Sequence, residues 1–471
     1  MAATPALDKV LAHIDSTLPE STDRLVDLMR IPSISTDPAY DGDCRAAAQW
    51  LAADLAALGF AADTRSTPGH PMVVAQDAPG APETAPHVLF YGHYDVQPVD
   101  PLDLWHRDPF DPAVEDTPAG KVIRGRGAAD DKGQLMTFVE ACRAWLAVHG
   151  ALPVRVTVFL EGEEESGSPS LVPYLKSHGD ELKADVALIC DTGMFDRETP
   201  AITTMLRGLV GEEITIRAAD KDLHSGMFGG IAMNPIRVLG RIIAGLHDAN
   251  GRVTLPGFYD GVPELDPDVA RQWEGLGFDH KEFLGGVGLS EPAGEADRSP
   301  LEMIWSRPTC EFNGITGGYT GAGFKTVLPA QASAKISFRL VGEQDPLAVR
   351  ESFRRYVRDM LPPDCEVEFA EHGASPASRM AIDDPAFEAA RQALSQEWPR
   401  EAAFVGSGGS IPVAGYFKTI LGMDSMLIGF GRDDDQIHSP NEKYDMESFH
   451  KGIRSWARIL AALSQKPGEG G

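Results

Sequence analysis

The chain has 471 residues, of which 43% are hydrophobic, so it can bury large cores and is neither disordered nor fibrous. Its 70 acidic and 42 basic residues give a formal net charge of −28, which repels nucleic acids and anionic membrane surfaces. We therefore expect no nucleic acid partner.

Residues 1–35 are typical of an amphipathic helix, because acidic residues interrupt the apolar core that a secretory signal needs. No apolar run reaches the roughly 18 residues of a membrane span. The five cysteines are widely spaced and include no CxxC pair, which favours free thiols in a reducing compartment over disulfides or cysteine-bound zinc. A soluble, cytoplasmic protein without a membrane partner is expected.

Residues 1–206 alternate helix-like and strand-like segments. Apolar runs predict strands near 72–75, 87–92, 154–160 and 185–190, and helices are expected at 44–58, 134–147 and 169–178. This alternation is typical of an α/β fold with a mostly parallel sheet that is covered on both faces.

From about Arg207 the pattern changes. Strands are predicted at 212–218, 332–341 and 366–372 and helices at 234–248 and 346–361, whereas 251–300 has no strong periodicity. Segregated strands and helices suggest a small α+β insert. The α/β alternation resumes at about 378 with a helix at 386–394. We therefore predict that residues 1–206 and 378–471 form one discontinuous catalytic domain, which residues 207–377 interrupt.

Six candidate site residues follow strands of the catalytic domain or lie in loops beside them. Ligands collect outside the carboxyl ends of strands in open α/β sheets, so these side chains are expected to converge on one crevice. Two histidines and four carboxylates in one crevice indicate a metal site. The six residues are His93, Asp130, Glu164, Glu165, Asp191 and His438.

Each motif alone has a plainer explanation. Asp95 could hold the imidazole of His93 in one tautomer, but an isolated His-x-Asp is more often a surface pair. The run EGEEESGS (161–168) could be a solvated acidic turn. GRGAADDKG lacks both the third glycine of a dinucleotide fingerprint and the GK[ST] of a phosphate loop, which argues against a nucleotide-dependent ligase. The joint occurrence of the motifs favours the metal site.

Taken in order, the motifs resemble the co-catalytic dizinc metallopeptidases, a family that includes aminoacylases, acetylornithine deacetylase, succinyl-diaminopimelate desuccinylase, carboxypeptidase G and the carnosinases. The strings YGHYDVQPVD, GRGAADDKG, EGEEESGS, DLHSGMFGG, GFKTVLP, SFRLV, GGSIPV and IHSPNEK carry the resemblance, which runs from about residue 20 to 460. LPGFYDGV, GGSIPV and NEK are most similar to the cytosolic nonspecific dipeptidase and carnosinase branch. The resemblance implies a zinc-peptidase catalytic domain and a smaller α+β lid and dimerisation domain.

The resemblance also implies two divalent metal ions per subunit, most often zinc, with manganese or cobalt as alternatives. One ion would be bound by His93, Asp130 and Asp191, and the other by Asp130, Glu165 and His438. Asp130 would bridge the two ions. Because family members hold the bridging aspartate in an unusual backbone, the peptide bond after Asp130 is predicted to be cis.

For catalysis, the resemblance assigns Glu164 as the general base and Asp95 as the partner of His93. His224 of DLHSG would stabilise the oxyanion in the neighbouring subunit's site of a homodimer. From its residue type alone, His224 is as readily a turn-capping histidine.

For substrate binding, Arg339 could form a bidentate pair with a substrate carboxylate, as the resemblance implies, although a strand-surface arginine is the plainer explanation. Thr326 and Ser410 match weaker contacts. Gly406 and Ser407 stand where this branch often has Arg-Glu before GGSIPV, which leaves the exact substrate open.

We therefore predict a dinuclear metallohydrolase that cleaves the amide bond of dipeptides or short peptides with a free carboxylate. The alternative with the same chemistry is an N-acyl amino acid deacylase, since no residue decides between a charged α-amino group and an uncharged acyl group. A non-catalytic metal-binding relative is less expected, because Glu164 accompanies the full ligand set.

Overall fold

The computed structural model describes residues 5–380, 382–409 and 411–465 and divides into two compact units. The first unit contains the described residues up to 204, those from 380 to 404 and those from 416 onward, and the second contains residues 205–379 and the described part of 405–415. Within these ranges, none of the helices has both the length and the apolar character that crossing a membrane requires.

A mixed sheet with the strand order β1-β2-β6-β3-β7-β17-β8 forms the centre of the first unit. β6, β3, β7 and β17 are parallel neighbours, which confirms the predicted parallel core. The predicted strand near 72–75 is β2, but it pairs antiparallel with its neighbours, and the outer strands β1 and β8 were not predicted. The bounds are β1 (Ala61–Arg65), β2 (Met72–Gln76), β3 (His87–His93), β6 (Arg155–Glu161), β7 (Val186–Ile189), β8 (Ala201–Leu206) and β17 (Ser425–Leu427).

The central strands are buried on both faces, as the run of 0–1% exposed residues from Val88 to Tyr91 shows. α4 packs on β3 and on α14, α3 packs on β1 and β2, and α5 packs on β6. The first unit has the helices α1 (Pro5–Ser16), α2 (Leu18–Met29), α3 (Asp41–Ala57), α4 (Lys132–His149), α5 (Leu171–Leu182), α12 (Pro385–Ser395) and α14 (Met446–Leu463), and the short turns η1 (Pro38–Tyr40), η2 (Leu102–Leu104), η3 (Glu164–Ser166) and η4 (Phe417–Leu421).

A small sheet with the order β18-β5-β4 joins two loops that are far apart in the sequence. β18 (Lys443–Asp445) pairs antiparallel with β5 (Gly120–Arg124), which also pairs with β4 (Ala113–Thr117). The loop that carries His438 precedes β18, and the turn that carries Asp130 follows β5. The register, with Lys443 opposite Arg124, therefore brings the two loops side by side.

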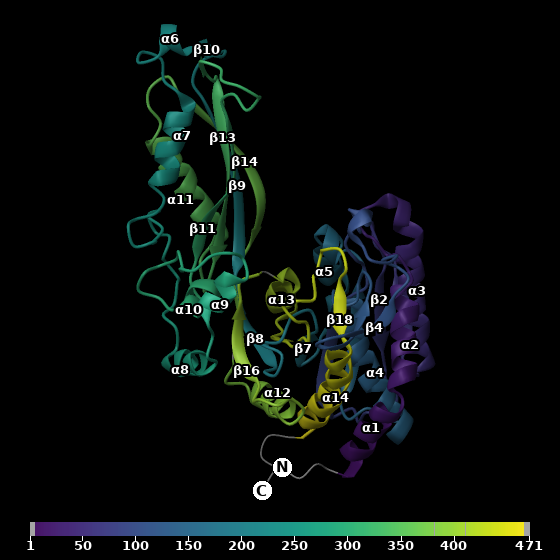
Figure 1. Cartoon of the computed structure of the whole chain (residues 1–471). Coiled ribbons are helices and arrows are strands. Elements are labelled where there is room, and N and C mark those ends of the chain that lie inside the picture. Colours follow the sequence, from purple (N-terminus) through teal and green to yellow (C-terminus); the bar gives the residue numbers. More distant parts are fainter. Residues whose placement is uncertain (1–4, 381, 410, 466–471) are drawn as a thin grey trace. The chain divides into compact units, whose positions relative to one another are not determined.

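The second unit is a four-stranded antiparallel sheet, β11-β13-β9-β14, with α7 and α11 packed on it (Figure 1). Alternate residues of β9 and β13 are buried in its core. β11, which a bulge interrupts between Phe312 and Gly314, was missed in the sequence, as were helices in 251–300. The bounds are β9 (Gly208–Arg217), β10 (Leu223–His224), β11 (Thr309–Gly317), β12 (Val327–Leu328), β13 (Gln331–Leu340), β14 (Glu366–Ser375), β15 (Ser378–Arg379), α6 (Ser225–Phe228), α7 (Pro235–Ala244), α8 (Pro267–Gly275), α9 (His280–Gly285), α10 (Pro300–Trp305) and α11 (Pro346–Asp359); β16 (Ala403–Ser407) and α13 (Pro412–Tyr416) cross the unit boundary.

Candidate metal centre

The parallel strands of the first unit deliver the candidate ligands to one edge of the sheet. His93 is the last residue of β3, Glu164 and Glu165 lie in the turn η3 after β6, and Asp191 follows β7. β3 lies between β6 and β7, so the three strand ends are neighbours. The expected convergence at the carboxyl edge therefore occurs.

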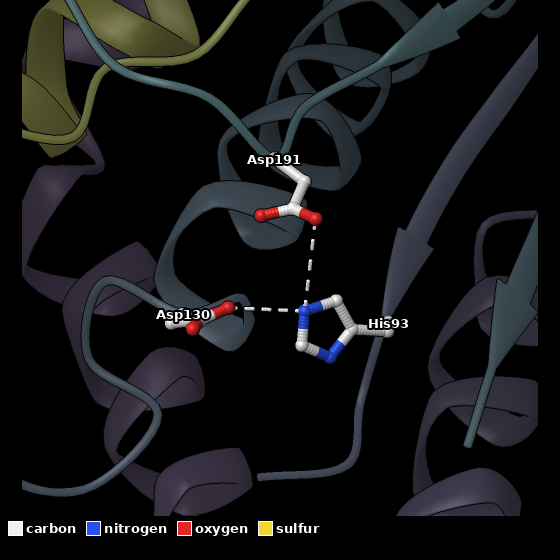
Figure 2. A group of neighbouring side chains, drawn as sticks. All are labelled: His93, Asp130 and Asp191. Carbon is white, nitrogen blue, oxygen red and sulfur yellow. Dashed lines mark hydrogen bonds and ion pairs between the residues drawn. The ribbon is translucent and has the colours of Figure 1, made fainter. Parts of the chain in front are cut away.

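Figure 2 shows His93, Asp130 and Asp191 pointing toward one another. Nε2 of His93 is 3.0 Å from Oδ1 of Asp130 and 4.0 Å from Oδ2 of Asp191. The imidazole is fully buried, and its other nitrogen, Nδ1, is 3.1 Å from the backbone carbonyl oxygen of Asp95. Nδ1 is thus the donor, so in the neutral imidazole Nε2 carries the lone pair and could bind a metal ion.

A second group of three shares Asp130 with the first. Nε2 of His438 is 2.9 Å from Oδ2 of Asp130 and 3.2 Å from Oε2 of Glu165. Asp130 therefore gives one oxygen to each histidine. In both groups the candidate ligand atoms lie within 4.8 Å of one another.

A third acidic group, Asp434, Asp435 and Asp445, has a different explanation. The ammonium group of Lys443 lies between these carboxylates, at 2.8, 2.6 and 2.9 Å. Arg432 and Arg197 also pair with Asp445, at 2.8 and 3.2 Å, so three cations accompany the three carboxylates and the group is an ion-pair network at the start of β18.

The two groups around Asp130 lack such a cation. In the described part of the chain, the ion pairs of Asp95, Asp130, Glu165 and Asp191 are with the two histidines alone. Buried carboxylates without a compensating charge are costly, so this donor set of imidazole and carboxylate fits divalent metal ions.

The protonation of the groups reflects this crowding. Hydrogen bonds to Asp130 and Glu165 raise the pKa of His438 to about 10. Burial alone would raise the pKa of Asp130, but hydrogen bonds from His438 and His93 lower it below its usual range. Burial and the neighbouring carboxylates hold the pKa of Asp191 well above its usual value. Without metal, the protons on the histidines provide the positive charge.

Glu164 lies beside the ligands, and burial raises the pKa of its carboxyl to about 7, with the charges of Glu165 and Asp95 adding to the effect. Asp95 fixes the turn that carries it. The two carboxylate oxygens of Asp95 accept hydrogen bonds from the backbone N–H groups of Glu164, at 3.2 Å, and Glu165, at 3.1 Å. Gln97 donates to Oε2 of Glu165 at 2.7 Å.

The glutamates of EGEEES (161–166) have two different roles, which the sequence did not reveal. Glu161 accepts a hydrogen bond from the hydroxyl of Tyr91, at 2.7 Å. Glu163 accepts from the backbone N–H groups of His70, at 2.9 Å, and Ser170, at 3.0 Å. These two carboxylates hold the local structure, whereas Glu165 belongs to the second candidate ligand group and Glu164 is its neighbour in the chain.

The turn after β5 contains two further features. The Asp130–Asp131 peptide bond is cis, as predicted. Asp131, which was not considered a site residue, is fully buried and accepts a hydrogen bond from the backbone N–H of His93, at 3.1 Å. Its side chain thus links the end of β3 to this turn.

The other predicted site residues belong to the second unit. His224 in β10 pairs with Val327 in β12, and the backbone N–H of Ser225 donates to the carbonyl of Thr326 at 3.0 Å, so His224 and Thr326 are close neighbours. Arg339 lies on β13 on the half-exposed face of its sheet. Ser410 lies outside the described residues.

A doubly wound α/β unit with histidine and carboxylate groups that share one aspartate defines a metal-dependent hydrolase. Comparison with known proteins agrees with this class. Residues 89–462 match the family model Peptidase family M20/M25/M40, and the chain belongs to that family.

Three relatives are similar over nearly their whole length. The chain is 31% identical to the Cys-Gly metallodipeptidase dug1 of Schizosaccharomyces pombe, covering 98% of each chain. The crystal structure of human carnosine dipeptidase 1 has a TM-score of 0.80 and 28% identity, covering 98% of this chain and 100% of the other. The metallo-carboxypeptidase Sso-CP2 of Sulfolobus solfataricus has a TM-score of 0.81 and 31% identity, covering 94% and 99%. The predicted family and branch are confirmed.

Proposed function

We propose that the protein hydrolyses the peptide bond of dipeptides or short peptides that end in a free carboxylate, with two divalent metal ions, most often zinc, per subunit. The observation that carries the proposal is Asp130, whose two oxygens lie 3.0 and 2.9 Å from the histidines of two ligand groups. Two dipeptidases and a carboxypeptidase among the relatives support this substrate class.

His93, Asp130 and Asp191 would hold one ion, and Asp130, Glu165 and His438 the other. Bound there, the ions would lower the pKa of a water molecule and polarise the scissile carbonyl. Glu164 accepts the proton of the attacking water and delivers it to the leaving amine. Without metal, burial raises the pKa of this carboxyl to about 7, and the charge of bound ions would lower it, which favours the ionised form that accepts the proton.

Residues 207–377 are proposed to act as a lid and dimerisation domain. Arg339 would bind the substrate carboxylate, with Thr326 and Ser410 as further contacts. His224 would donate to the oxyanion in the partner subunit's site. Its Nδ1 accepts a hydrogen bond from the backbone N–H of Gly226 at 2.9 Å, so a neutral imidazole carries its proton on Nε2 and can donate from there.

Exposed apolar side chains around β10 and β12 support the homodimer. Large apolar patches are rare on monomers and mark association surfaces. Six large side chains on α6, on the segment after it, on β11 and between β11 and β12 are 40–92% exposed: Met227, Phe228, Ile231, Ile315, Tyr319 and Phe324.

The cytoplasm is the proposed location. All five cysteines are free and four of them are buried, which suits a reducing compartment.

Metal analysis combined with turnover of a substrate panel tests the proposal. The panel contains dipeptides, N-acetylated dipeptides and N-acyl amino acids. Release of both amino acids from dipeptides, dependent on about two metal ions per subunit, is the expected result. Hydrolysis of N-acyl amino acids alone would make the protein a deacylase. No hydrolysis by the metal-loaded protein would contradict catalysis altogether.

A further inference from the structure

We infer that Glu442 is a positioning residue for both metal sites: it holds the turn that carries Asp130 against the loop that carries His438. This inference rests on the proposed function only for the identity of the ligands. Glu442 belongs to neither candidate ligand group, and its role follows from what its carboxylate and its backbone contact.

The carboxylate of Glu442 is enclosed by donors from the turn 126–130. Oε1 accepts hydrogen bonds from the backbone N–H groups of Ala129, at 2.9 Å, and Asp130, at 3.1 Å. Oε2 accepts from the backbone N–H of Gly127, at 3.1 Å, and from the guanidinium of Arg126, at 2.7 Å. Glu442 therefore fixes the backbone of the bridging aspartate directly.

The side chain is completely buried, and the neighbouring Arg126 is 1% exposed. Arg126 also donates to the carbonyl of Pro98, at 3.0 Å, and lies over the ring of Trp105, 5.3 Å from its centroid. The ion pair adds no net charge to the acidic metal centre. Because its acceptor positions are filled by donors, the carboxylate is not available as a metal ligand.

The backbone of Glu442 restrains the loop that carries His438. The backbone N–H of Gly125 donates to the carbonyl of Glu442 at 3.0 Å, and His438 lies only four residues before it. This loop holds Gln436, His438 and Asn441 at φ of 57°, 61° and 68°, a left-handed backbone that is unfavourable for these residues and must be held in place.

Asn441 provides one such restraint. Its side-chain Oδ1 accepts from the backbone N–H of His106, at 2.8 Å, and its Nδ2 donates to the carbonyl of Leu104, at 2.9 Å. Glu442 provides a second restraint. Of these two residues, only Glu442 hydrogen-bonds to the turn that carries Asp130. One carboxylate thus sets the spacing between the bridging ligand and a ligand of the second metal ion.

The test is Glu442→Gln. The amide offers one acceptor oxygen and turns an NH₂ group toward backbone N–H donors, so the turn should lose its fixed geometry. We expect zinc affinity, measured by competition with a chromophoric chelator, to fall about 10–100-fold, as for other residues that orient ligands. Amide hydrogen exchange in 127–131 of the metal-free protein should become faster. Excess zinc should restore much of the lost turnover.

Glu140→Gln is the matched control. Glu140 is also buried, 3% exposed, and is paired with an arginine, since Arg24 donates to it at 2.6 Å, but it joins α2 to α4 away from the ligands. This variant should lose thermal stability and keep its zinc affinity. Equal losses of zinc affinity in both variants would overturn the inference, because they would reflect general destabilisation.

Glu442→Asp covers the case in which Glu442→Gln does not fold. It keeps the charge but shortens the side chain, so the hydrogen bonds to the turn should lengthen and zinc affinity should again fall. Wild-type zinc affinity and exchange rates in Glu442→Asp, or in a folded Glu442→Gln, would overturn the inference. The zinc-affinity and hydrogen-exchange measurements use no substrate, so they test the inference whether or not the protein cleaves dipeptides.

Discussion

The carboxylate of Asp95 accepts a hydrogen bond from the backbone N–H of Glu164, 3.2 Å away. Its other oxygen accepts from the next N–H, at 3.1 Å, and Nδ1 of His93 lies 3.4 Å from the same carboxylate. A single buried side chain thus joins His93 of the first candidate ligand group to the turn that carries the proposed base, Glu164, and Glu165 of the second candidate group.

Asp95→Ala should therefore impair both groups at once. Loss of a carboxylate that orients ligands typically lowers metal affinity or activity about 10–100-fold. Zinc titration against a chelator and steady-state turnover measure the effect. Asp185→Ala is a suitable control. Asp185 accepts a hydrogen bond from the backbone N–H of His87, at 2.8 Å, and His87 begins β3, at the opposite end from His93. Comparable losses in the control would refute a role specific to the site.

Replacement of Glu164 should separate metal binding from catalysis. Glu164→Ala is expected to keep two metal ions and lose at least the roughly 10²–10⁴-fold that general acid–base catalysis contributes. Glu165→Ala should instead lose one ion, because Glu165 lies 3.2 Å from His438 in the second group. Metal content and kcat of both variants decide the matter. The reverse pattern would mean that the two neighbouring carboxylates exchange roles.

Much of the first unit could be predicted because its signals are local. Uninterrupted apolar runs such as 87–92 define buried parallel strands, and a ligand at the end of each strand must lie at the shared edge. The strands and helices of the insert were harder to predict. β11 contains Gly314 and Gly317 and alternates poorly, because it lies at the edge of its sheet and buries few of its residues.

The supporting residues of the site could not be predicted from the same signals. Glu442 acts on a turn that precedes it by more than three hundred positions, and only the pairing of β18 with β5 brings them together. Glu161 and Glu163 look identical in sequence to Glu164 and Glu165, yet they hydrogen-bond away from the ligands. Such roles depend on tertiary contacts that no local spacing encodes.

Metal removal should make stability depend on pH in a defined direction. In the metal-free protein the pKa of His438 is raised from 6.5 to about 10, so the folded state holds the proton more tightly than the unfolded state does. The resulting stabilisation is complete below pH 6.5 and is lost as the pH rises through about 10. The Tm of the chelator-treated protein should therefore fall from pH 7 to 10.

Two comparisons isolate this effect. His438→Ala, also free of metal, should show a shallower decline of Tm over the same range, because it lacks the titrating imidazole. Zinc-loaded wild-type protein should likewise decline less, since metal replaces the proton between the carboxylates. Tm is measured by circular dichroism in all three samples. The same decline of Tm with pH in all three would refute the role of His438 in this pH dependence.

The proposed dimer predicts complementation between two inactive variants. His224→Ala lacks the proposed oxyanion donor and Glu164→Ala lacks the base, so each homodimer should be nearly inactive. In a mixed dimer, the subunit that keeps Glu164 receives His224 from its partner. That dimer contains one intact site of two, because a two-fold interface exchanges the residues reciprocally.

Equal amounts of the two variants should therefore recover about a quarter of wild-type activity, since half of the randomly formed dimers are mixed and each has one working site. The variants are co-refolded, subunit exchange is verified with two affinity tags, and dipeptide turnover is measured. A double variant, His224→Ala with Glu164→Ala, mixed with wild-type protein is the control. Its mixed dimers have no complete site, because each active site would lack either the base or the donor, so activity should fall below that of the wild-type subunits alone. If the two single variants exchange subunits and recover no activity, His224 acts within its own chain or has no part in catalysis.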